Sequence, residues 1–341
     1  MANLNLNSKK SLCVCLCIYK SEDGLPYVLA NLHKIYASGI FSRFKVMAVY
    51  EANEAHFTSS RPSAHSSCSA YELLTSFANH LPINSVEIIE NAYPTTCVRQ
   101  RNIGNARNTC LNRMRSMRDR GSGTDADTGA GAETYDYFAM MDANNYSCIG
   151  PVDTDVLREA VSRSEEWDAV SFLREAGYYD CWALSFDPYV YSFFHFNNPV
   201  RYRYEICDKM NAAFKTYVET ETSSDAHSGG GGGGGGGGLL PVYSAFNGFA
   251  LYKSAIYLSE DLRYSDEIDL ALFPEDMLEK QIQLVGRGID GRINDDCEHR
   301  YFHLASMQPP HNARIYIYSK FLFKKVPDTD RPSRFHPRAP V

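Results

Sequence analysis

The sequence lacks the patterns that mark several classes of protein. Its ten cysteines include no CxxC pair, which argues against a disulfide scaffold and a structural zinc site. Basic residues number 34 and acidic residues 41, and a net charge of −7 argues against nucleic acid as the main partner. The apolar run 12–19 is too short for a membrane span or a signal-peptide core with its cleavage site. We therefore expect a reduced, cytoplasmic protein without a transmembrane segment, with peripheral attachment to a membrane as the alternative.

Two low-complexity stretches interrupt the chain, at 121–133 and at 222–238, and the second ends in ten consecutive glycines. Neither stretch can bury apolar surface, and long loops cost little entropy, so we predict two loop insertions into one domain covering 10–323. The glycine run could instead be an interdomain linker. Residues 324–341 are basic and contain prolines, which predicts a flexible tail or, alternatively, a segment that binds an acidic glycan or a membrane surface.

The periodicity of the remaining sequence alternates between strands and helices. This order predicts an α/β fold with a mostly parallel central sheet, helices on both faces, and ligands at the carboxyl ends of the strands. The alternating run SLCVCLCI predicts a buried strand whose cysteines are small apolar residues. The expected strands cover 12–19, 44–50, 86–89, 135–141 and 169–173, and the expected helices cover 25–37, 103–118 and 151–163.

The segment YDYFAMMDANNYS joins an apolar strand directly to Asp142 and Asn144. Two oxygen ligands two residues apart after a strand favour a hard divalent cation that bridges two phosphates, as in the DxD motif of nucleotide-sugar enzymes. A plain strand-to-loop turn is the alternative, since Asp and Asn are turn formers.

The segment DDCEHRYFH places Asp295, Asp296 and Glu298 before His299 and His303. Neighbouring carboxylates disfavour one another's ionisation, which suits a general base. The two histidines share one face if the segment is helical. The alternative is an ordinary helix start with acids at its N-terminal end and one buried histidine.

Two other segments contain candidate binding residues. RQRNIGNARN leads into a basic helix, and Arg101 and Arg107 near its start predict that this end binds a diphosphate. A solvated basic helix face is the alternative. In AGYYDCWALSFD, Asp180 and Trp182 belong to an aromatic patch suited to a sugar, although aromatic strips are more often core. SAFNGFALYKS contains Gly248, where the backbone could approach a ligand closely.

Taken in order, these motifs resemble the GT-A (Rossmann-like) nucleotide-sugar glycosyltransferases. The similar group includes fungal capsule-associated mannosyltransferase-like proteins and related enzymes of large DNA viruses and bacteria. The resemblance covers about 10–323 without the two insertions. The matching segments are 49–53 with Thr58, 101–108, 141–144, 178–184, 244–253, and 297–299 with Phe302 and His303.

The resemblance implies a hexosyl- or pentosyltransferase that moves a sugar from a UDP- or GDP-sugar to a hydroxyl of a glycan or glycoconjugate. It also implies dependence on Mn²⁺ or Mg²⁺ and inversion at the anomeric carbon. Glu298 would be the base, with Asp296 as substitute. The implied donor-binding residues are Glu51, Arg101, Asn105, Arg107, Asp142 and Gly248; the acceptor-binding residues are Asp180 and Trp182; the metal ligands are Asp142, Asn144 and His303.

Two other functions remain open at this point. Asn144 replaces the usual second acid, and a neutral ligand weakens metal binding, so the chain could be a catalytically weak relative that binds nucleotide sugar or carbohydrate. A metal-dependent phosphohydrolase using Asp142, Asp296 and the histidines is the second alternative.

Overall fold

The chain is an α/β protein built on one eight-stranded sheet. The computed structural model describes residues 10–18, 24–50, 70–91, 93, 96, 98–119, 133–143, 148–175, 178, 180–190, 200–224, 238–286 and 296–325. The strands are β1 (Ser11–Ile18), β2 (Arg43–Tyr50), β3 (Val86–Glu90), β4 (Tyr137–Asp142), β5 (Ala169–Arg174), β6 (Leu239–Pro241), β7 (Phe249–Lys253) and β8 (Ile315–Phe323).

Helices follow most of these strands. They are α1 (Leu25–Ala37), α2 (Ala70–Ala78), α3 (Arg99–Asp119), α4 (Thr154–Ser162), α5 (Val200–Ser224), α6 (Ser254–Tyr257), α7 (Glu275–Val285) and α8 (Glu298–Met307), with a 3₁₀ turn at Leu270–Leu272. The predicted helix at 25–37 is found with the same bounds. The helix expected at 103–118 begins earlier, at Arg99, and the Asn102 side chain exchanges hydrogen bonds with the Thr96 backbone just ahead of it.

The strand order is β3-β2-β1-β4-β7-β5-β8-β6. Four of the seven described pairings are parallel, which confirms the predicted mostly parallel sheet. β7 runs antiparallel between β4 and β5. A tertiary contact accompanies this direction: the chain reaches β7 from the carboxyl end of β4, where the Gly248 carbonyl accepts a hydrogen bond from the Asp142 N–H at 2.8 Å.

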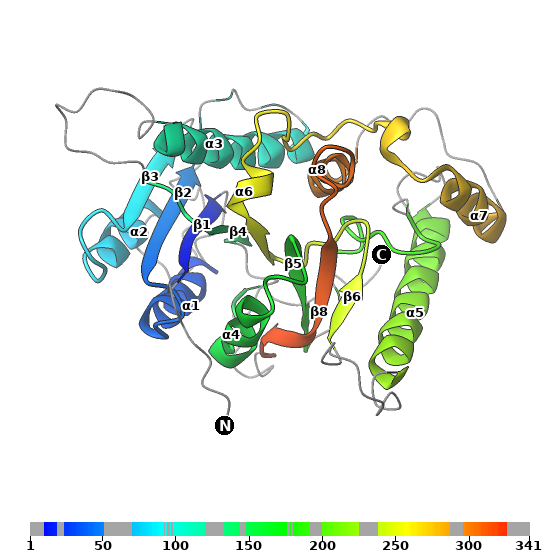
Figure 1. Cartoon of the computed structure of the whole chain (residues 1–341), viewed down its shortest axis with the longest axis horizontal. Coiled ribbons are helices and arrows are strands. Elements are labelled where there is room, and N and C mark those ends of the chain that lie inside the picture. Colours follow the sequence, from blue (N-terminus) through cyan, green and yellow to red (C-terminus); the bar gives the residue numbers. More distant parts are fainter. Residues whose placement is uncertain are drawn as a thin grey trace.

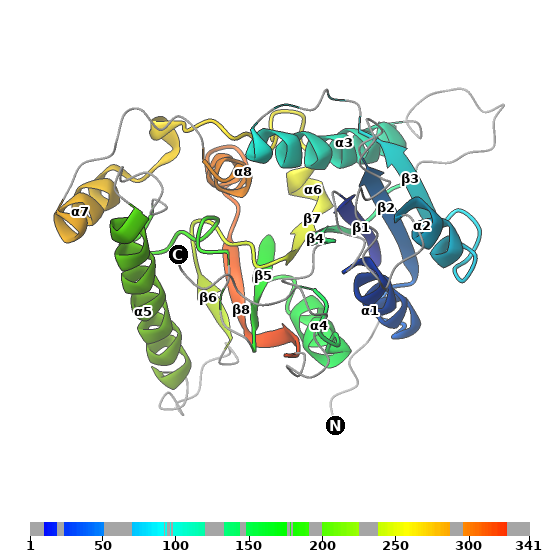
Figure 2. The same cartoon turned by 180° about the vertical axis from the view of Figure 1, so that it is seen from behind.

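Both faces of the sheet are covered, as Figures 1 and 2 show, with α3 and α8 on one side and α1 and α4 on the other. The alternation in β1 sends Leu12, Val14 and Leu16 into the core beneath α1, α2 and α4. Cys13 and Cys15 face the other core, beneath α3, α6 and α8. Both are buried free thiols, so the interpretation of SLCVCLCI as a buried strand is confirmed.

The carboxyl edge of the sheet brings distant segments together. Asp142 is the last residue of β4 and pairs in register with Cys17 of β1. α3 packs against β1, β2 and α8, and Gly248, the residue before β7, bonds the end of β4. A ligand site on a parallel sheet belongs at this edge, because the strands end there and their loops diverge.

Several predicted features lie partly or wholly outside the described residues. These are the two low-complexity stretches, apart from their ends, and most of the basic tail. α5 continues to Ser224, so the predicted loop at 222–238 begins inside this helix. Across the described parts of the chain, no helix combines the length and hydropathy needed to cross a membrane.

Candidate functional site

Arg107 is the centre of a buried charge cluster at the carboxyl edge of the sheet. Its guanidinium donates to Glu298 Oε1 and forms an ion pair with Asp142 Oδ1 at 3.1 Å. Only 4% of Arg107 is exposed. Burial alone would lower the pKa of Arg107, but the charges of Glu298 and Asp142 outweigh burial and raise it. Three predicted site residues, up to 191 positions apart in sequence, are therefore in direct contact.

Asp142 owes its position to β4 and to the neighbouring glycine. Gly248 has φ of +93°, a backbone conformation that favours glycine, and its carbonyl accepts from both the Asp142 N–H and the Cys148 thiol. Gly248 thus fixes the end of β4 through its backbone. The close approach of this backbone to a donor sugar, which the resemblance implies, stays a prediction.

Glu298 is the first residue of α8 and is buried. Burial raises the pKa of Glu298, while the neighbouring Arg107 opposes the shift. The adjacent acid, Asp296, has a different partner. It accepts from the Cys297 N–H at 2.6 Å and pairs with Arg300 at 2.9 Å, one helical turn along α8.

Aromatic rings surround the arginine. The Arg107 guanidinium carbon lies 4.6 Å from the centre of the Phe246 ring and 5.6 Å from that of Tyr264. The Phe246 ring also stacks on His299 with centroids 3.8 Å apart. These apolar faces exclude water from the cluster, which strengthens its ion pairs and raises the cost of breaking one of them.

The two histidines of α8 share one face, as the helical spacing predicts, and both lie in the core. His303 is 1% exposed; its Nδ1 bonds Ser244 Oγ at 2.9 Å and its Nε2 bonds the Tyr252 hydroxyl at 3.0 Å. Burial lowers the pKa of His303 to about 3, so the ring is neutral. His299 Nδ1 lies 3.5 Å from the same Tyr252 hydroxyl.

These contacts bear on the predicted metal ligands. Both ring nitrogens of His303 are engaged in the core, whereas Asp142 lies at the sheet edge. Asn144 falls outside the described residues, as do Glu51 and Asp295. Among the residues that the structure describes, no group of three or more His, Cys, Asp or Glu side chains could hold a metal ion. Asp142 is the described residue that fits a hard cation best, because it is a carboxylate at the end of a strand.

The N-terminal half of α3 binds the segment after α6. Arg101 is half-exposed and pairs with Asp266 at 3.2 Å, and the Asn108 side chain exchanges two hydrogen bonds of 2.9 Å with the Tyr264 backbone. Asn105 is partly exposed on the same helix, and its backbone carbonyl accepts from the Thr109 hydroxyl. Arg101 and Asn105 thus lie on the helix that carries Arg107.

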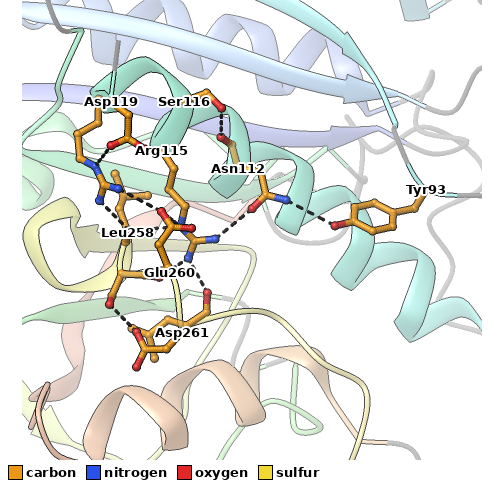
Figure 3. A network of polar contacts seen from close by, with 11 residues as sticks. Tyr93, Asn112, Arg115, Ser116, Asp119, Leu258, Glu260 and Asp261 are labelled. Carbon is orange, nitrogen blue, oxygen red and sulfur yellow. Dashed lines mark hydrogen bonds and ion pairs between the residues drawn. The ribbon is translucent and has the colours of Figure 1, made fainter. Parts of the chain in front are cut away.

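The C-terminal half of α3 also contacts the segment after α6, and Figure 3 shows the polar contacts of Arg115 and its neighbours there. Arg115 donates to the carbonyls of Leu258, Ser259 and Leu262, and it pairs with Glu260 at 3.8 Å. This basic residue is therefore structural rather than part of a solvated face. It fixes the segment that supplies Tyr264 to the Arg107 cluster.

The predicted acceptor residues lie on the segment after β5, and α8 holds that segment in place. Arg300 is fully buried and donates to the carbonyls of Trp182, Leu184 and Val190 and to the Ser185 hydroxyl. Trp182 is partly buried and packs against the core under α3 and α8.

Asp180, two residues before Trp182, is partly exposed. Burial, followed by the charges of Glu298 and Asp142, raises the pKa of Asp180 to about 7.

Sequence reasoning gave no role to three residues that build this site: Arg300, and Phe246 and Tyr252, which it included only as members of the matching segment 244–253. The spacing of Asp296 and Arg300, four residues apart in a helical segment, was a signal for the first. No pattern identified the other two, because aromatic residues in a strand or beside it look like ordinary core. The residues proposed for a phosphohydrolase do not converge, since Asp296 pairs with Arg300 and the histidines bond Tyr252.

Comparison with known proteins gives little beyond the geometry. No protein-family model and no curated protein matches the chain. The solved structure of M. tuberculosis glucosyl-3-phosphoglycerate synthase is similar over 48% of this chain and 45% of its own, with 10% identity and a TM-score of 0.28. The chain thus spans less than half the length of that protein. A UDP-glucose pyrophosphorylase complexed with UDP-glucose is similar over 92% and 91%, with 11% identity and a TM-score of 0.37. Likenesses this weak carry no argument about function, so membership of the glycosyltransferase family stays a prediction from the residues.

Proposed function

We propose that the chain is a glycosyltransferase that uses a nucleotide-sugar donor. One observation carries the proposal: Arg107, Asp142 and Glu298 meet at the carboxyl edge of the sheet, and Asp180 lies near enough for their charges to shift its pKa. Ligands of open α/β sheets bind at this edge. The chemistry of these residues suits a phosphorylated sugar. The buried cation can stabilise the negative charge that grows on a departing phosphate, and a carboxylate can accept the proton of a hydroxyl.

The proposed donor is a UDP- or GDP-sugar, and the proposed acceptor is a hydroxyl of a glycan or glycoconjugate. Arg101 and Asn105 lie on the same helix as Arg107 and would bind the donor, together with Glu51. Asp180 and Trp182 would bind the acceptor. We propose transfer with inversion, which needs the base and the departing diphosphate on opposite sides of the anomeric carbon.

The metal requirement is a further part of the proposal. The cluster sets one arginine against the two carboxylates of Asp142 and Glu298, with Asp180 as a further acid nearby, an imbalance that favours a divalent cation at Asp142 before a diphosphate enters. When bound, Mn²⁺ or Mg²⁺ would supply positive charge to the departing diphosphate. Asp142 and Asn144 would hold it, and His303 would join only by giving up its bonds with Ser244 and Tyr252.

Arg107 has its own part in this reaction. It already pairs with Asp142, so a donor diphosphate that enters beside Asp142 meets a guanidinium held by two carboxylates and an aromatic ring. A fixed guanidinium stabilises charge without reorganising during the reaction. The proposed role of Arg107 is therefore to orient and neutralise the diphosphate.

Thermal unfolding of the purified protein tests the proposal. The probes are UDP-glucose, UDP-galactose, UDP-xylose and GDP-mannose, each with and without Mn²⁺. A ligand that binds only the folded state raises the melting temperature. At a ligand concentration of about 100 times the Kd, it stabilises the folded state by about 2.7 kcal/mol. We expect one base class to produce a Mn²⁺-dependent shift that Asp142→Ala abolishes. The exposed Asp208→Asn on α5 is the matched control and should keep the shift.

The alternatives predict other outcomes. No shift with any of these donors would overturn the proposed function. A shift that is independent of Mn²⁺, without release of nucleoside diphosphate in the presence of acceptor sugars, would support a relative that binds but does not transfer.

A further inference from the structure

The two acids that the sequence suggests as a general base are both held by arginines. Glu298 is 5% exposed and its carboxylate receives the Arg107 guanidinium. Asp296 is 2% exposed and pairs with Arg300 while accepting from the Cys297 N–H. A base needs an oxygen lone pair that reaches the acceptor hydroxyl, and a buried carboxylate paired with an arginine offers it poorly.

Asp180 differs from both acids in its contacts. Its side chain accepts one hydrogen bond, from the Ala183 N–H at 3.2 Å, and within the described residues no ion pair is formed with it. The residue is partly exposed, whereas Glu298 and Asp296 are buried. A carboxylate with one weak backbone bond retains oxygen lone pairs for a substrate.

Asp180 lies on a segment that α8 of the charge cluster holds in place, because Arg300 of α8 donates to the Trp182 carbonyl, two residues after Asp180, and pairs with Asp296, two residues before Glu298. The pKa of Asp180 responds first to burial and then to Glu298 on α8, Asp142 on β4 and Arg107 on α3. These groups come from three elements that meet over the sheet edge. A hydroxyl that contacts Asp180 is therefore near the position proposed for the donor diphosphate.

The backbone around Asp180 is fixed, as a positioned catalytic group requires. The Asp180 carbonyl accepts from Ala183 N–H at 3.1 Å, which closes a turn, and Cys181 Sγ contacts Asn211 Oδ1 of α5 at 2.9 Å. Arg300 holds the following segment by the Trp182 carbonyl. Fixed geometry of this kind contributes to catalysis because little reorganisation remains to be done.

Resting on the glycosyl transfer proposed above, we propose that Asp180 is the general base that deprotonates the acceptor hydroxyl. The Asp180 carboxylate takes the hydroxyl proton as the acceptor oxygen forms its bond to the anomeric carbon. The bond from that carbon to the diphosphate oxygen breaks at the same time, and the nucleoside diphosphate leaves with the electron pair. The proton then passes from Asp180 to solvent. Glu298 is assigned to holding Arg107.

Steady-state kinetics of four proteins test this assignment: wild type, Asp180→Asn, Asp180→Glu and Glu298→Gln. The donors are UDP-glucose and GDP-mannose with Mn²⁺, the acceptors are methyl glycosides, and release of nucleoside diphosphate is measured. Calorimetry gives the donor Kd for each protein. We expect Asp180→Asn to lower kcat at least about 100-fold and to leave the donor Kd within about threefold. Asp180→Glu should recover at least about tenfold of the lost kcat, because it restores a carboxylate.

The outcomes separate this assignment from the proposed function. If the wild type binds neither of these donors, nor UDP-galactose or UDP-xylose, both proposals fail. If the wild type transfers sugar and Asp180→Asn keeps more than about a tenth of its kcat, only the assignment of Asp180 fails. The assignment also fails if Asp180→Asn loses donor affinity as much as it loses activity, because Asp180 would then bind the donor and not the acceptor proton. Glu298→Gln should weaken donor affinity as well as kcat, and a change in kcat alone would return the role of base to Glu298.

Discussion

Replacing Asp180 with Asn should stabilise the protein at high pH. Burial, followed by the charges of Glu298 and Asp142, raises the pKa of the Asp180 carboxyl in the folded protein to about 7, against an ordinary 3.8, and Arg107 offsets this rise only in part. An acid with a raised folded-state pKa binds more protons when folded. Its contribution to the free energy of unfolding therefore falls as pH rises from about 3.8 to about 7. Asn has no charge and avoids this loss.

The size of the effect follows from the shift. A difference of about 3 pKa units corresponds to about 4 kcal/mol at pH 8, taken as an upper limit. Asp180 is partly exposed, so solvent screens its neighbours and about half of that value, roughly 2 kcal/mol, is the expected gain. At pH 5 the folded carboxyl is already protonated, and less than half of the pH 8 gain should remain.

Urea unfolding at pH 8 and pH 5 measures both values for wild type and Asp180→Asn. The matched control is Asp208→Asn, an exposed acid on α5, which should change the free energy of unfolding by less than about 0.5 kcal/mol at both pH values. A gain at pH 8 that persists undiminished at pH 5 would refute the electrostatic reasoning. A loss of stability at pH 8 would show that the ionised carboxylate makes contacts worth more than its burial costs.

Four other substitutions, one of them a matched control, test the packing and the buried charges by urea unfolding. Gly150→Ala should cost about 2–3 kcal/mol, because a Cβ there would lie 1.7 Å from the Lys324 carbonyl oxygen. Gly104→Ala, whose Cβ would meet only ordinary contacts, should keep or slightly raise stability; equal losses in the two variants would contradict the clash. Arg300→Met should cost about 3–5 kcal/mol by leaving a buried acid without its partner, and a cost below about 1 kcal/mol would rule that out. His303→Gln should lower the free energy of unfolding at pH 8, and this loss should be up to about 2 kcal/mol smaller at pH 5. The reason is that the wild-type histidine, with its pKa near 3, stays neutral in the folded protein, whereas the unfolded chain takes up a proton below about pH 6.5. A loss that is equal at both pH values would contradict this reasoning.

Local patterns in the sequence predicted the strands β1 to β5, whereas β6, β7 and β8 were not among the expected strands. The alternation in SLCVCLCI identified β1, and the apolar run ending at Asp142 identified β4 and the acid at its end. The spacing of His299 and His303 predicted that they share one helical face. Each of these features depends on residues that are neighbours along one element, so a period of two or of 3.6 suffices to find it.

Pairings between distant residues could not be predicted in this way. Nothing near Arg107 in sequence shows that its carboxylate partners are 35 and 191 positions away. The antiparallel direction of β7 is accompanied by the Gly248 carbonyl meeting the end of β4, which is also a tertiary contact. The polar bonds of His303 are of the same kind, since Ser244 and Tyr252 belong to another segment.

The contacts of Arg300 have a consequence for how this site can change during evolution. Three of its four acceptors in the segment after β5 are main-chain carbonyls, at Trp182, Leu184 and Val190. A carbonyl is present whatever the side chain, so substitutions at these three positions leave the anchoring bonds in place. The segment can therefore acquire a different surface, and with it a different sugar preference, while one buried arginine keeps its backbone where it is.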